Sequence, residues 1–158
     1  MKHIKIYEDV NDPNNLLFDG SFMSWLRTNY PKKEEWNKIK ELYCDGMNFT
    51  SIDGIENLEN LELLYCHDNS LIKLDNIEKV KNLKYLWCFN NFLTSLKGLD
   101  KLENLKEIWC YNNYLTEIDG IENLTGLRTL WCSNNRFDND YKKYLIDWCD
   151  NNNIKLEI

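Results

Sequence analysis

Long apolar runs are missing from this chain of 158 residues, and so is an excess of basic side chains. No apolar run approaches the roughly 20 residues of a membrane-spanning helix, and residues 1–9 hold no apolar core of a secretion signal. Lysine and arginine number 19 against 26 acidic residues, which gives a net charge of −7. Because nucleic acids and anionic membranes require a phosphate-neutralising surface, we expect neither as a partner. We expect an intracellular, cytoplasmic protein with reduced thiols.

Motifs that carry catalytic chemistry are also missing. The chain has no phosphate-binding loop, no Gly-x-Ser-x-Gly turn and no His-Glu-x-x-His helix. Cys66 and His67 are adjacent, but neighbouring residues of a strand point to opposite faces and cannot meet. Without a Cys-x-x-Cys pair, no metal site is predicted. We therefore expect a protein that is not an enzyme and has no cofactor.

What the chain has instead is a period of 22 residues. Five repeats begin at Ile39, Leu61, Leu83, Leu105 and Leu127. Repeat positions 1, 4, 6, 11, 14, 17 and 20 are apolar or cysteine until the last repeat ends. Positions 3 to 7 predict a short parallel strand. Positions 14 to 20 predict a turn or short 3₁₀ segment, because a repeat of 22 residues leaves little room for an α-helix.

The spacing Leu-x-x-Leu-x-(Leu/Cys)-x-x-Asn-x-Leu resembles the leucine-rich-repeat family, specifically the short class seen in internalin-type and intracellular proteins. The resemblance covers residues 39–137. It implies an α/β right-handed solenoid with a parallel sheet on the concave face and 3₁₀ or turn segments on the convex face. Members usually bind proteins through that sheet. Two features depart from the pattern: cysteine replaces leucine at position 6 of every repeat, and Met47 stands where later repeats have asparagine.

Residues on either side of the repeats predict caps, since a solenoid exposes its core at each end. Residues 1–38 form the predicted N-terminal cap, with a short strand over 3–7 and a helix over 22–29 that Ser21 caps. Residues 138–158 form the predicted C-terminal cap. It comprises a helix over about 140–149 and a strand over 154–158. One apolar stripe is expected on that helix, made of Tyr141, Tyr144, Leu145 and Trp148.

Alternation along each strand assigns residues to two faces. Positions 4 and 6 point into the core, so a column of five buried thiols is expected: Cys44, Cys66, Cys88, Cys110 and Cys132. Position 9 carries asparagines that can bond the backbone of the turn after each strand: Asn69, Asn91, Asn113 and Asn135. We expect both sets to be structural.

Positions 3, 5 and 7 point out of the core and carry the candidate binding residues. Position 5 is aromatic in every repeat: Tyr43, Tyr65, Trp87, Trp109 and Trp131. Other candidates come from positions 3 and 7: Tyr85, Glu107, His67, Phe89 and Tyr111. Large apolar side chains outside the core mark interaction sites, and tryptophan and tyrosine dominate binding hot spots. At one edge, position 2 predicts a basic column of Lys40, Lys84, Lys106 and Arg128 that Glu62 interrupts.

The sequence therefore predicts a protein-binding module whose aromatic face binds an unknown protein or peptide, such as an extended or proline-rich segment. A carbohydrate-binding surface is an alternative, and so is a self-associating structural component or a homodimer through the same face. Replacing Trp109 with alanine is expected to weaken partner binding by about 2 kcal/mol and to leave the melting behaviour nearly unchanged.

Overall fold

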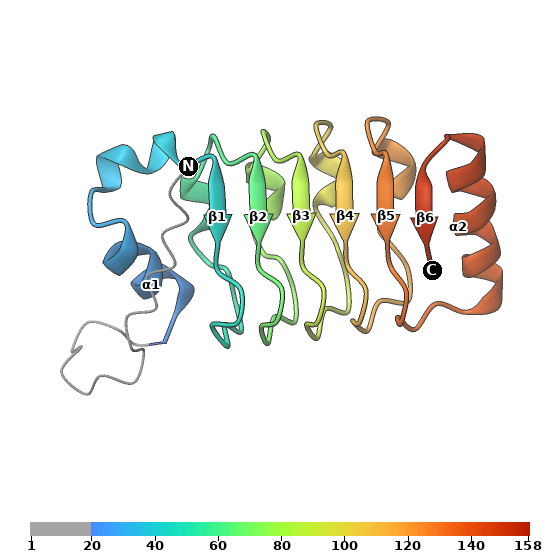
Figure 1. The fold of residues 1–158 in the computed structure, drawn as a ribbon, viewed down its shortest axis with the longest axis horizontal. Helices are drawn as coiled ribbons and strands as arrows, with labels where there is room; N and C mark the ends of the chain where they lie inside the picture. Colours follow the sequence, from blue (N-terminus) through green and yellow to red (C-terminus); the bar gives the residue numbers. More distant parts are fainter. Residues whose placement is uncertain (1–19) are drawn as a thin grey trace.

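The computed structural model describes residues 20–158, which form one row of coils (Figure 1). The six strands are β1 (Glu41–Tyr43), β2 (Leu63–Tyr65), β3 (Tyr85–Trp87), β4 (Glu107–Trp109), β5 (Thr129–Trp131) and β6 (Lys155–Glu157). The 3₁₀ segments are η1 (Lys33–Lys38), η2 (Ile55–Asn57), η3 (Ile77–Lys79), η4 (Leu99–Lys101) and η5 (Ile121–Asn123). Two α-helices lie at the ends of the row, α1 (Phe22–Asn29) and α2 (Asn139–Asn151).

All six strands form one parallel sheet in the order of the sequence. Each residue pairs with the residue 22 positions later, so that Leu42 lies opposite Leu64 and Trp87 lies opposite Trp109. This register places the same repeat position of every coil in one column across the sheet. The predicted solenoid with short strands and 3₁₀ segments is therefore confirmed.

Left-handed backbone at repeat position 16 turns each coil into its 3₁₀ segment. The φ angles there are 105° at Gly54, 65° at Asn76, 98° at Gly98 and 63° at Gly120. Glycine and asparagine adopt this region with the least steric strain, which is why the period carries them at this position. Each η segment then lies against the η segment of the next coil.

The core lies between the sheet and the η segments. Position 4 and position 6 side chains are fully buried, including the leucines of β1 to β3 and all five thiols of the repeats. Burial raises the pKa of the thiols, to about 12 for Cys88. A neutral thiol with so high a pKa behaves as a small hydrophobic side chain. The predicted inward cysteine column is confirmed.

Helix α1 and η1 pack beside the first coil. Ser21 accepts a hydrogen bond from the Ser24 N–H, as an N-cap residue does. The rings of Phe22 and Trp25 contact Phe49 edge-on at centroid distances of 5.7 and 5.9 Å. The apolar face of α1 therefore joins the core of the first repeat. Residues 3–7, for which the sequence predicts a strand, lie outside the described residues.

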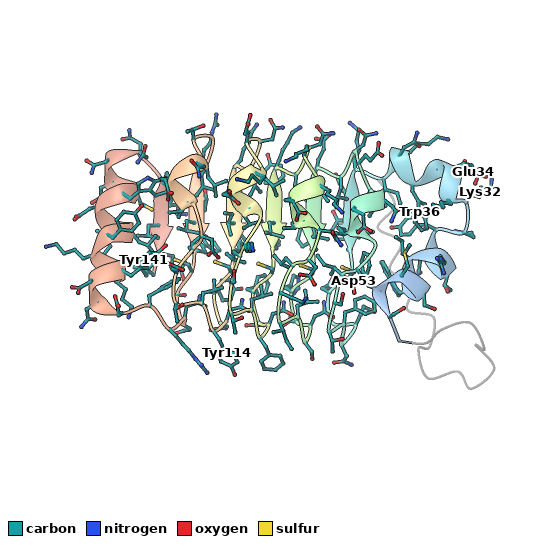
Figure 2. The ribbon with its side chains drawn as sticks, turned by 180° about the vertical axis from the view of Figure 1, so that it is seen from behind. Lys32, Glu34, Trp36, Asp53, Tyr114 and Tyr141 are labelled. Carbon is teal, nitrogen blue, oxygen red and sulfur yellow. The ribbon has the colours of Figure 1, made fainter. Side chains whose placement is uncertain are left out.

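Helix α2 packs beside β6 at the other end, and Figure 2 shows Tyr141 at that end with Trp36 at the opposite one. Asp138 caps the helix by accepting the Tyr141 N–H. The predicted apolar stripe is wrong in one member, because Tyr144 is 42% exposed. Leu145 and Cys149 are the fully buried positions of this helix, so the stripe is centred one residue later than the sequence indicates.

Candidate functional site

The outer face of the sheet carries two columns of rings, which we call the aromatic face. The central ring column is repeat position 5 and comprises Tyr43, Tyr65, Trp87, Trp109 and Trp131. The second ring column is repeat position 7 and comprises His67, Phe89 and Tyr111. The alternation of each strand aims these side chains away from the core, because positions 4 and 6 already fill it.

Rings of the central column stack on one another along most of its length. Trp87 and Trp109 have centroids 3.9 Å apart with planes 5° apart, and Trp109 and Trp131 are 4.1 Å and 17° apart. Tyr43 stacks on Tyr65 at 4.7 Å. The step from Tyr65 to Trp87 differs, because these rings meet edge to face at 66°. The column therefore consists of two stacks joined by one T-shaped contact.

The second ring column is stacked in the same way. His67 lies 4.2 Å from Phe89 with planes 8° apart, and Phe89 lies 4.4 Å from Tyr111 with planes 9° apart. Phe89 also approaches Trp109 at 6.4 Å, so the two columns are in contact. The sequence-predicted rings are thus brought together on one surface.

Stacking leaves mainly the ring edges for a partner. Tyr65 and the three tryptophans are partly buried although they lie outside the core. Tyr43 and Tyr85, at 39% and 36%, are the more exposed rings of this face. Ring faces covered by neighbouring rings cannot receive a flat ligand, whereas ring edges carry partial positive charge and contact apolar groups and hydrogen-bond acceptors.

The three indole N–H groups of the central column differ in their partners. Trp87 donates to the Glu107 carboxylate, with Nε1 and Oε1 3.1 Å apart. The Nε1 atoms of Trp109 and Trp131 are buried and have no hydrogen-bond partner in the described part of the chain. Buried donors of this kind are uncommon in folded proteins, because each loses its hydration without gaining a hydrogen bond.

Carboxylates around the rings raise the pKa of several phenols. The pKa of Tyr43 rises to about 12 because the ring is partly buried and its hydroxyl donates to Glu41 at 3.0 Å. The pKa of Tyr65 rises through burial and the charges of Glu107 and Glu41. These phenols are therefore neutral donors at physiological pH.

A second ladder of amides runs beside the aromatic face, and the sequence analysis missed it. Asn90 donates to Asp68, Asn112 donates to Asn90 and Asn134 donates to Asn112, with distances of 2.7, 2.6 and 2.9 Å. All four residues have φ of 53–54°, the left-handed region that asparagine and aspartate tolerate. Asparagine at position 8 of three successive repeats was the available signal. Asp68 also accepts from His67, with oxygen and Nδ1 2.7 Å apart.

The inner asparagine ladder at position 9 is confirmed. Asn113 accepts the Leu93 N–H at 2.9 Å and donates to the carbonyls of Cys88 and Cys110 at 3.1 and 3.0 Å. The same bonds recur at the other three positions, Asn69, Asn91 and Asn135. Each side chain joins two coils, because it bonds the turn of its own coil and the turn of the preceding one.

At the edge of the sheet, the expectation that Glu62 interrupts a basic column is wrong. Glu62 accepts from Lys40 at 2.9 Å and from Lys84 at 2.6 Å, so it links the two lysines. These hydrogen bonds lower the pKa of Glu62 to about 2. Half of the column, Lys40 and Lys84, is therefore engaged within the protein.

Cys66 and His67 lie on opposite sides of the sheet. Cys66 is fully buried, whereas the His67 ring stacks on Phe89 in the outer column. Among residues 20–158, no group of three or more histidine, cysteine, aspartate or glutamate side chains is placed to hold a metal ion. None of the described helices has the length and apolarity needed to cross a membrane.

A stack of 22-residue coils with an asparagine ladder and a parallel sheet defines a repeat solenoid, and comparison with known proteins gives its family. The family model described as "Leucine Rich repeats (2 copies)" matches residues 59–101, 81–123 and 103–141, which together span more than half of the chain. The chain belongs to the leucine-rich-repeat family. No curated protein sequence matches the chain significantly.

Solved structures of similar fold come from two bacteria. A leucine-rich-repeat protein of Leptospira interrogans is 26% identical with a TM-score of 0.61, and the match covers 66% of this chain and 27% of that one. An internalin of Listeria monocytogenes is 29% identical with a TM-score of 0.58, and covers 66% and 33%. The chain thus spans a third or less of the length of these two proteins. Leucine-rich-repeat proteins are generally interaction modules without enzymatic activity, and the fold supports that general role here.

Proposed function

We propose that this protein binds an extended segment of a partner protein across its aromatic face. The observation that carries the proposal is that both ring columns lie outside a core that is already complete. Rings that the core does not need are typical of binding surfaces, in which tryptophan and tyrosine supply most of the free energy of association.

The stacking favours a peptide over a carbohydrate. Sugar rings and proline-rich helices bind aromatic side chains through ring faces, and here most faces of the central column are covered by neighbouring rings at about 4 Å. Ring edges and the shallow space between two columns suit the apolar side chains of an extended segment. We therefore propose a protein segment that need not be rich in proline.

The first test compares capture of partner proteins by the wild type and by the double variant Trp87→Ala/Trp109→Ala. Loss of the same captured protein in the double variant supports the proposal. Tyr144→Ala is the matched control, because it removes an exposed ring from α2 rather than from the aromatic face. Equal capture by all three proteins would exclude the aromatic face as the binding site.

The stacked geometry changes the expected effect of Trp109→Ala on stability. Trp109 contacts a ring on each side, so its removal forfeits two aromatic contacts worth roughly 0.5–1.5 kcal/mol each. We expect a loss of about 1–3 kcal/mol in the free energy of unfolding. Chemical denaturation measures this loss, and an unchanged free energy would contradict the stacking.

Tyr85→Ala separates binding from folding. Tyr85 lies on the same face, is 36% exposed and makes no ring contact with other residues of the described chain. Its removal should weaken partner binding and leave the unfolding curve close to that of the wild type. A second copy of this chain is the alternative occupant, and sedimentation at several concentrations would reveal it as a dimer that the double variant loses.

A further inference from the structure

The two unpartnered indole N–H groups mark one end of the aromatic face as chemically different from the rest. Trp87, Trp109 and Trp131 occupy the same repeat position and their ring planes are nearly parallel. Only Trp87 has an acceptor, the carboxylate of Glu107. Glu107 stands at position 3 of the strand that follows Trp87, so the chain itself shows that a carboxylate in this place accepts the indole proton.

The register names the residues that stand in the equivalent place for the other two indoles. Glu107 pairs with Thr129, and Thr129 pairs with Lys155. Thr129 therefore takes the place of Glu107 beside Trp109, and Lys155 takes it beside Trp131. The Lys155 ammonium lies 5.4 Å from the centre of the Trp131 ring. Neither side chain supplies a carboxylate, and a lysine cannot accept a hydrogen bond.

Charge at this end of the sheet is compatible with an anion. The strands β4 to β6 and the residues just before them carry the cations Lys106, Arg128 and Lys155, and the carboxylates Glu107 and Glu157. Glu107 is engaged by Trp87, so Glu157 is the carboxylate that opposes an incoming anion. Lys155 is exposed, and its flexible side chain can leave the Trp131 ring to pair with a ligand.

We infer that the β5–β6 end of the aromatic face binds a carboxylate of the partner segment, which accepts an indole N–H of Trp109 or Trp131 and pairs with Lys155. The carboxylate is either an acidic side chain or the C-terminus of the segment. This inference rests on the proposed function and adds a polarity to it, because it places the acidic end of the bound segment over β5 and β6.

The test uses short peptides as probes and the indole ¹H–¹⁵N signals of the intact protein as the readout, assigned with single Trp→Phe variants. The probes are acetyl-Gly-Glu-Gly-amide, acetyl-Gly-Gln-Gly with a free C-terminus, and acetyl-Gly-Gln-Gly-amide, which has no carboxylate. We expect one or both carboxylate peptides to move the Trp109 or Trp131 signal downfield at millimolar concentration. The first two peptides distinguish a side-chain carboxylate from a terminal one.

Lys155→Met keeps the length of the side chain and removes its charge, and we expect it to weaken the carboxylate peptide by about threefold, as for an exposed ion pair. Lys143→Met on α2 is the matched control and should leave the titration unchanged. Indole signals that do not move, that move equally with the neutral peptide, or that ignore Lys155→Met would each overturn the inference.

The two proposals fail in different ways. If Trp87→Ala/Trp109→Ala abolishes capture of the partner but the indole signals do not respond to carboxylates, the aromatic face binds and the inferred subsite does not exist. If capture is unaffected by the double variant, the proposed function itself is wrong, whatever the peptides do.

Discussion

Single polar side chains hold neighbouring coils together, and Asn113 shows how. Its amide satisfies an N–H and two carbonyl groups of the turns around it, and it is only 3% exposed. Backbone groups in these turns cannot reach sheet partners, so the side chain takes the place that a strand would have. The ladder is therefore a condition for packing irregular backbone inside the stack.

Asn113→Ala should lower the free energy of unfolding by about 1–3 kcal/mol, because it leaves buried backbone groups without partners. The neighbouring Asn112 belongs to the exposed ladder at φ 54°, and Asn112→Gly keeps that backbone conformation accessible. We expect the second change to be nearly neutral. Urea unfolding of both variants checks the prediction, and a comparable loss in both would contradict the structural ranking of the two ladders.

The unpartnered Trp109 N–H offers a second prediction. Thr129→Gln brings an amide carbonyl to the position that Glu107 holds beside Trp87, without adding a like charge next to Glu107. We expect the variant to be more stable by about 0.5–1.5 kcal/mol, the usual net contribution of a hydrogen bond. Thermal unfolding measures the gain, and the Trp109 indole proton should shift downfield. Thr129→Val, which supplies no acceptor, is the control.

At the scale of elements, α2 is attached to the last repeats by a hydroxyl as well as by apolar packing. The Tyr141 hydroxyl accepts the Ile118 N–H at 2.7 Å and donates to the Ile118 carbonyl at 3.3 Å. Partial burial raises the pKa of this phenol to about 12. We propose that α2 and the strand after it form the C-terminal cap and that α1 with η1 belongs to the N-terminal one.

Tyr141→Phe should destabilise the protein by about 1–3 kcal/mol, since the Ile118 N–H then lacks its partner. Hydrogen exchange should show earlier opening of α2 and β6 than of the central coils. Tyr144→Phe removes an exposed hydroxyl from the same helix and should change the stability by less than about 0.5 kcal/mol. Equal behaviour of the two variants would count against the proposed role of Tyr141.

The thiol column makes stability depend on alkaline pH. Burial raises the pKa of Cys88 and Cys132 to about 12, whereas unfolding returns each thiol to its ordinary value near 9. The unfolded chain therefore loses protons first, and the stability that is present below about pH 9 is lost as the pH rises toward the folded pKa. Each such thiol contributes a slope of about 1.4 kcal/mol per pH unit.

We expect the free energy of unfolding to fall steeply above about pH 9, and Cys88→Ala to reduce the slope by about 1.4 kcal/mol per pH unit. Denaturant titrations at several pH values, under reducing conditions, measure both slopes. A variant slope equal to that of the wild type would mean that Cys88 titrates in the folded protein.

The sequence predicts elements well where a period decides them. Alternation around the leucines of each strand assigns Cys88 inward and Trp87 outward, and both assignments are confirmed. It predicts less where side-chain rotamers decide. The T-shaped step between Tyr65 and Trp87 and the unpartnered N–H of Trp109 depend on how rings settle against one another. Tyr144 was misplaced because the stripe was drawn without Cys149, a thiol that packs as an apolar side chain.

At the scale of the whole molecule, each coil contacts only its neighbours, and the sheet keeps one register from β1 to β6. Such an arrangement makes stability a sum of terms from single coils and from the contacts between them. The same regularity gives the aromatic face a direction, with Glu41 beside Tyr43 at one end and Lys155 beside Trp131 at the other.

The unbroken register has a consequence for the size of the surface. Excising residues 83–104, one full period, would bring Tyr65 opposite Trp109 and preserve every inward position. Inserting a period would lengthen both ring columns by one step. The reach of this protein along a ligand is therefore counted in coils, as on a ruler with fixed divisions, and can be adjusted without redesigning any one of them.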